Sequence, residues 1–110
     1  MTKHVDTYFS LASPWTFLGW DRLHEIVGRR RATVAYYPID LAVVFPATGG
    51  VPLLERAPER RAYRLAELRR WTAYLGVDDF NIEPRYFPTD PRSATLLAIA
   101  ARERGDDIAG

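Results

Sequence analysis

The first 40 residues carry a strand, a helix and a second strand in succession. Residues 4–10 alternate in polarity and residues 33–39 are rich in β-branched and aromatic side chains, both typical of strands. Between them, residues 15–27 have apolar side chains at helical spacing, and Gly28 is expected to end that helix. Strands joined through a helix run parallel with a right-handed crossover, so the pattern predicts a βαβ unit and an α/β fold class.

The junction between the first strand and its helix carries Ser13 and Pro14. Serine is a favoured helix N-cap, and proline at the first helical position loses only an N–H that has no partner there. Backbone N–H groups at a helix N-terminus also point outward, and the positive end of the dipole stabilises anions, including a thiolate. Ser13 therefore has two interpretations: a helix cap, or a hydroxyl that donates a hydrogen bond to a bound sulfur.

The rest of the chain predicts helices and loops but no further strand. Residues 40–58 are rich in proline and glycine and predict a long loop with room for one helical turn. Residues 59–75 predict the clearest helix, and a third helix opens at Asp90 and Pro91. The apolar stripe expected on the helix of residues 59–75 is Leu65, Leu68, Trp71 and Leu75. A pair of parallel strands normally belongs to a larger sheet, so the predicted sheet is incomplete.

Composition excludes several classes of function. The absence of cysteine rules out disulfides, thiolate metal sites and dithiol redox chemistry, and with only two histidines we expect no metal site. A net charge of +1 from 15 basic and 14 acidic residues argues against nucleic acid or an anionic membrane as partner. No apolar run reaches the roughly 20 residues of a membrane span. We therefore expect a soluble, cytoplasmic protein.

The residues around Ser13 resemble the start of the DsbA-like thioredoxin-fold group, which contains DsbA-type oxidoreductases, kappa-class glutathione transferases and 2-hydroxychromene-2-carboxylate isomerases. The oxidoreductases carry Cys-Pro-x-Cys at this junction. The transferases and isomerases have a serine that contacts the sulfur of glutathione, and this chain has Ser13-Pro14-Trp15-Thr16. The resemblance continues through residues 39–41, 48–52, 61–63, 67–71 and 87–88.

This resemblance implies a thioredoxin-like βαβ unit over residues 1–45, followed over residues 46–110 by the start of an α-helical insertion. Members of the group are about twice this length, within the ordinary range of domain sizes. Their later strands complete the sheet and the glutathione site. We therefore expect either a homodimer or a fold completed by further chain.

The function that the resemblance implies is a glutathione-dependent isomerase of the 2-hydroxychromene-2-carboxylate type, acting on a small aromatic carboxylate. In such enzymes the thiolate of glutathione, the cofactor, adds to the conjugated substrate, permits rotation and then leaves. Ser13 would be the catalytic residue that stabilises the thiolate. Ser13, Pro14, Trp15 and Thr16 would bind the cofactor.

Three further residues are candidates for the substrate pocket. Phe45 would line an aromatic pocket. Gly50 stands where the isomerases and transferases often have asparagine, so it is either a departure from their ligand contact or simply part of a turn. Arg61 belongs to an arginine stripe, with Arg56, Arg60 and Arg64, which would either face an anionic substrate or lie in solvent.

Two alternatives remain open at this point. A kappa-class-like glutathione transferase would activate the thiolate in the same way but release a conjugate, so product analysis separates it from an isomerase. A non-catalytic thioredoxin-like interaction module would instead form a stable assembly with a partner chain. A dithiol oxidoreductase is excluded because the chain has no cysteine.

Overall fold

The computed structural model describes residues 2–105. Contacts divide the chain into two compact units. The first contains the residues up to Asp40 together with those from Thr89 onward, and the second contains Leu41–Pro88. The predicted domains, residues 1–45 and 46–110, stay a prediction. The two compact units are defined instead by contacts within the chain.

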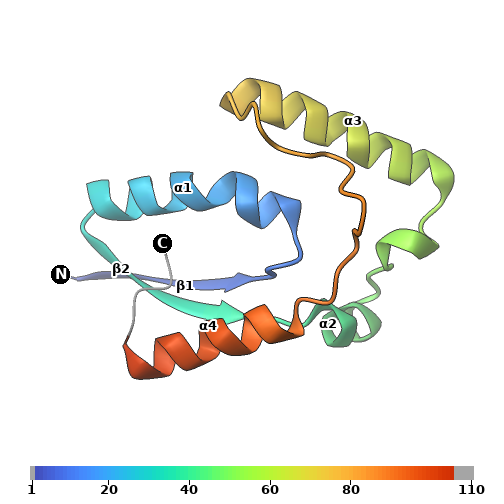
Figure 1. The fold of residues 1–110 in the computed structure, drawn as a ribbon. Coiled ribbons are helices and arrows are strands. Elements are labelled where there is room, and N and C mark those ends of the chain that lie inside the picture. The colour runs from blue at the N-terminus through green and yellow to red at the C-terminus, as the bar shows by residue number, and fades with distance from the viewer. Residues whose placement is uncertain (1, 106–110) are drawn as a thin grey trace. The chain divides into compact units, whose positions relative to one another are not determined.

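The first unit is built on the parallel strands β1 (Lys3–Phe9) and β2 (Ala32–Pro38), which α1 (Pro14–Arg29) connects. Their register is continuous, from Lys3 opposite Ala32 to Phe9 opposite Pro38. The helix α4 (Arg92–Arg104) also packs against β2. Figure 1 shows α1 and α4 on opposite sides of the two strands. The predicted βαβ unit is confirmed, and within the described residues the sheet has two strands.

An aromatic cluster joins α1 to the strands. Phe9 is 6% exposed, and its ring centroid lies 5.0 Å from that of Trp20 and 6.4 Å from that of Tyr36. His24 completes the cluster, with Nδ1 2.8 Å from the Trp20 carbonyl oxygen and Nε2 2.6 Å from the Tyr36 hydroxyl. A carbonyl can only accept, so Nδ1 of His24 donates to it, and in the neutral ring Nε2 accepts from Tyr36. These contacts fix the position of α1 over β2.

Arg102 joins α4 to the other side of β2. Its Nη1 donates to the Tyr36 carbonyl oxygen over 2.8 Å, and its guanidinium lies 5.3 Å from the centroid of the Tyr37 ring. Tyr37 in turn stacks on Tyr8 of β1, with centroids 4.9 Å apart. A single arginine thus combines a hydrogen bond with a cation–π contact, which holds α4 against the strand.

The end of α1 differs from the prediction that Gly28 would stop it. The helix continues to Arg29, and Arg30 donates its backbone N–H to the Ile26 carbonyl oxygen at 2.9 Å. The left-handed residue of the turn into β2 is Arg31, with φ of 51°. The prediction was wrong because a glycine inside a helix is tolerated at modest cost, and here the chain reverses three residues later.

The second unit contains α2 (Leu41–Thr48), the 3₁₀ turn η1 (Leu53–Glu55) and α3 (Pro58–Leu75). The sequence predicted a loop with one helical turn here, but α2 is a helix of 8 residues. The prediction treated Pro46 as a loop residue, whereas it lies inside the helix. Proline removes one N–H donor and is unfavourable within a helix, but a short helix can still form around it.

Leu68 is fully buried in α3, and Thr72 is 8% exposed beside it. Trp71, which was expected in the buried stripe, is 44% exposed, so that part of the prediction is wrong. The buried face passes through Thr72 instead because its hydroxyl donates to the Arg69 carbonyl oxygen at 3.0 Å and so loses no hydrogen bond on burial. Gly76, with φ of 70°, ends the helix as predicted.

Two observations concern the described residues, 2–105. None of the helices there is long and apolar enough to cross a membrane. The same residues contain no group of three or more side chains that could hold a metal ion.

Candidate functional site

A short turn between β1 and α1 positions Ser13. The buried Ser10 accepts the Ala12 N–H through its hydroxyl oxygen at 3.2 Å, while its carbonyl oxygen accepts the Ser13 N–H at 3.2 Å. At the same edge, the N–H of Ile39 donates to the Phe9 carbonyl oxygen at 2.8 Å. Ser10 therefore closes the turn that leads into the helix, and the bond between Ile39 and Phe9 joins the ends of the two strands just before it.

Ser13 is the N-cap of α1. Its backbone is extended, with φ of −89° and ψ of 123°, and its Oγ accepts the Thr16 N–H at 3.4 Å. The carbonyl oxygen of Ser13 accepts the Phe17 N–H at 3.3 Å. The cap interpretation is confirmed. It uses only the acceptor capacity of the hydroxyl, so the O–H proton of Ser13 can still be donated to a ligand.

The N-terminus of α1 is electrostatically suited to an anion. Its first turn lies wholly within the described residues and contains no acidic side chain that would neutralise the dipole. Pro14 brings no N–H, and the Trp15 N–H has no acceptor among the described residues. Ser13 and Thr16 are half-buried and Trp15 is 41% exposed. The start of α1 therefore leaves two donors for a ligand, the Ser13 O–H and the Trp15 N–H.

Phe45 and Gly50, two of the predicted pocket residues, lie against each other at the end of α2. Gly49 adopts the left-handed conformation, with φ of 78°, and the Gly50 N–H donates to the Phe45 carbonyl oxygen at 3.0 Å. This hydrogen bond reaches back over the last turn, as in a Schellman motif. A Cβ atom at Gly50 would lie 2.4 Å from Cδ1 of Phe45 and 2.8 Å from its Cγ. The ring position of Phe45 therefore requires glycine at residue 50.

We predict that Gly50→Ala lowers the free energy of unfolding by about 1–3 kcal/mol, because the added methyl group forces the Phe45 ring out of its place. Gly19→Ala is the matched control, since no atom lies within 4 Å of its added Cβ and alanine favours a helix interior by about 0.5–1 kcal/mol. Urea unfolding of both variants measures the difference. Equal stability of Gly50→Ala and the parent chain would contradict the packing role.

The arginines of the predicted stripe lie in different surroundings. Arg61 is exposed on α3, and its side chain forms no hydrogen bond, ion pair or cation–π contact with any described residue. Arg64 is half-buried, with its guanidinium 5.3 Å from the centroid of the Phe87 ring. Burial lowers the pKa of Arg64, and the nearby charge of Arg56 lowers it further. The charge of Arg56 therefore acts directly on the guanidinium group of Arg64.

The predicted site residues fall into two groups. Ser13, Pro14, Trp15 and Thr16 belong to the first compact unit, whereas Phe45, Gly50 and Arg61 belong to the second. Their assignment to glutathione and to substrate stays a prediction. Ser10 was not among the predicted site residues, although a serine at a strand end is a recognisable signal for a side-chain turn. Nothing in the sequence pairs Arg64 with Phe87, which lies 23 residues away along the chain.

Comparison with known proteins assigns the family. The chain matches the DSBA-like thioredoxin domain over residues 4–109 and belongs to this family. The order β1-α1-β2 followed by further helices agrees with that assignment.

Within this family, the chain is similar to proteins named 2-hydroxychromene-2-carboxylate isomerase. A 2-hydroxychromene-2-carboxylate isomerase of Sphingobium xenophagum is 29% identical over 110 residues, which cover 99% of this chain and 53% of that protein. One from Pseudomonas putida is 31% identical over 93 residues, covering 84% of this chain and 43% of that protein. A solved structure of 2-hydroxychromene-2-carboxylate isomerase superposes with a TM-score of 0.54 at 27% identity, covering 88% of this chain and 55% of the other. The chain thus spans about half the length of these relatives.

Proposed function

We propose that this chain belongs to a glutathione-dependent isomerase that acts on 2-hydroxychromene-2-carboxylate or a closely related aromatic carboxylate. The names of its relatives support the isomerase class. The observation that supports the thiol cofactor is Ser13, whose hydroxyl caps α1 and keeps a proton to donate.

The residues at the start of α1 fit a thiolate. The Ser13 hydroxyl would donate a hydrogen bond to sulfur, the Trp15 N–H would supply a second donor, and the helix dipole would add a favourable potential. A hydrogen bond to a charged group stabilises it by about 1.5–3 kcal/mol. Together these groups would favour the deprotonated sulfur near neutral pH.

Bound glutathione would supply a thiolate that adds to the conjugated double bond, permits rotation and leaves with its electron pair, without net oxidation. The chain's own part is to keep the sulfur deprotonated at Ser13. Phe45, half-buried at the end of α2, stays a candidate for contact with the aromatic ring of the substrate.

Product analysis tests this proposal and separates it from the two alternatives. The protein would be incubated with glutathione and either 2-hydroxychromene-2-carboxylate or a chloronitrobenzene, with glutathione binding followed by calorimetry. Isomerised product with glutathione recovered supports the isomerase. A released conjugate would instead indicate a transferase, and absence of both binding and turnover would favour an interaction module.

A further inference from the structure

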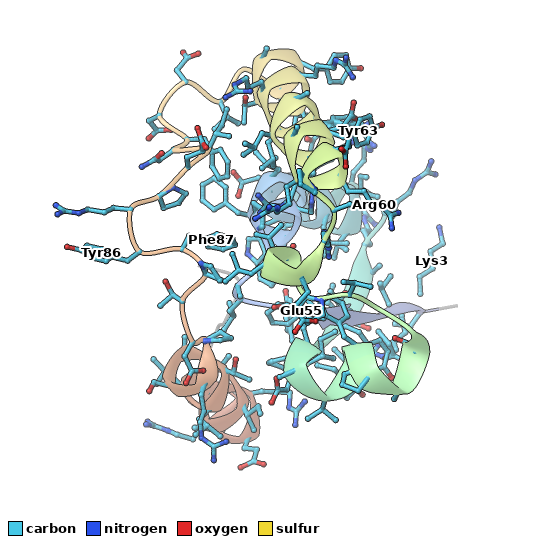
Figure 2. All side chains as sticks on the ribbon, turned by 90° about the vertical axis from the view of Figure 1, so that its right-hand side faces the viewer. Lys3, Glu55, Arg60, Tyr63, Tyr86 and Phe87 are labelled. Carbon is cyan, nitrogen blue, oxygen red and sulfur yellow. The ribbon has the colours of Figure 1, made fainter. Side chains whose placement is uncertain are left out.

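Arg64 has the features of a prepared anion-binding group. Its guanidinium lies over the Phe87 ring, at 5.3 Å from the centroid. Its side chain forms no hydrogen bond or ion pair with a described residue, so its five N–H donors stay available. Arg64 and Phe87 both belong to the second compact unit, and Figure 2 shows Phe87 on the loop that follows α3. The aromatic contact restricts the arginine without using its donors.

Arg56, whose charge acts on Arg64, is held by a hydrogen bond to the backbone. Its Nε donates to the Val51 carbonyl oxygen at 2.8 Å, which fixes the side chain within the segment before α3. This bond leaves the four N–H groups of its terminal nitrogens without an acceptor among the described residues. Arg56 thus also presents a fixed guanidinium with unused donors.

No described carboxylate neutralises these two charges. Glu55 and Glu59 lie close by in sequence, yet neither forms an ion pair with Arg56 or Arg64. Glu67 pairs with Arg70 instead. The field of Arg56 and the burial of Arg64 both disfavour the charge on Arg64. An anion that accepts hydrogen bonds from the unused donors of both arginines would offset this penalty.

We propose that Arg56 and Arg64 bind the carboxylate of a small organic acid, with the Phe87 ring keeping Arg64 in position. Two guanidinium forks suit a carboxylate because each can offer it two parallel N–H donors. This inference rests on the proposed function for its ligand: the carboxylate belongs either to the aromatic substrate or to glutathione. Exposed Arg61 takes no part in this site.

Binding of trans-cinnamate, measured by calorimetry on the full chain without glutathione, tests the site. Loss of hydrogen bonds to a charged group predicts that Arg64→Gln and Arg56→Gln each weaken cinnamate binding about tenfold or more. Arg69→Gln is the matched control, since it removes the same charge from α3 but only an exposed pair with Glu83. We expect Arg69→Gln to bind cinnamate like the parent chain.

Binding of cinnamamide tests whether the site requires a negative charge, and binding of glutathione tests which ligand carries the carboxylate. Cinnamamide has the same ring without the charge, so its binding should be indifferent to both arginine substitutions. If the substitutions weaken glutathione binding and leave cinnamate unchanged, the bound carboxylate is that of the thiol. Unchanged binding of both acids, or an equal loss for cinnamamide, would overturn the carboxylate site. Arginine-dependent cinnamate binding in a protein without isomerase activity would refute the proposed function and leave the site intact.

Discussion

Replacing Ser13 with alanine is expected to raise the pKa of the glutathione thiol bound to the protein by about one to two units. The expected size corresponds to one hydrogen bond to a charged sulfur, and each pKa unit amounts to 1.36 kcal/mol. The sign follows from the donor: the Ser13 proton favours the thiolate and lowers the thiol pKa, so its removal returns the pKa toward the ordinary value of about 8.5. Thiolate absorbance recorded against pH measures the shift.

Two further variants separate this effect from the capping role that the structure shows. Ser13→Thr keeps both the acceptor and the O–H proton, so the lowered thiol pKa should persist. Ser13→Asp also keeps the cap, but it lacks the donor at neutral pH and adds a negative charge, so the thiol pKa should rise. Alanine itself should cost about 0.5–2 kcal/mol of stability through the lost cap. A thiol pKa that is the same in all three variants would contradict a role of Ser13 in thiolate binding.

Phe9→Ala is expected to lower the free energy of unfolding by about 3–5 kcal/mol. The ring is 6% exposed and packs on Trp20 and Tyr36, so its removal leaves a cavity between α1 and the strands. The residue also directly precedes the turn that holds Ser13, and weaker glutathione binding should accompany the loss of stability. Chemical denaturation and calorimetry measure the two effects.

Tyr8→Ala is the matched control for Phe9→Ala. Tyr8 is the neighbouring residue on β1, is 67% exposed and loses only its stack on Tyr37, which is worth about 0.5–1.5 kcal/mol. An equal loss in the two variants would contradict a core centred on Phe9.

The local signals of the sequence predicted the βαβ unit and the cap well. Alternation in β1, the serine and proline at the start of α1, and Gly76 after α3 each act over a few residues, and each lies where it was expected. The errors arose at glycine and proline, which can either end a helix or lie within one. Gly28 is a helix residue rather than a helix end, and Pro46 lies within α2 rather than in a loop.

Side-chain partnerships between distant residues could not be predicted. Nothing in the sequence indicates that His24 bonds to Tyr36, or that Arg102 reaches the carbonyl oxygen of that same Tyr36 from α4. Such contacts depend on how the helices cross the strands. The requirement for glycine at residue 50 is equally invisible in sequence, because it arises from the Phe45 ring rather than from the backbone dihedral angles.

The most direct test of the proposed function is the rate of 2-hydroxychromene-2-carboxylate isomerisation at increasing glutathione concentration, with the remaining glutathione quantified at the end. We predict a protein-dependent rate that rises from the uncatalysed value to saturation, falls roughly 10- to 100-fold in Ser13→Ala, and leaves the amount of glutathione unchanged. A protein-dependent rate that is the same without glutathione would contradict the account, and so would stoichiometric consumption of the thiol.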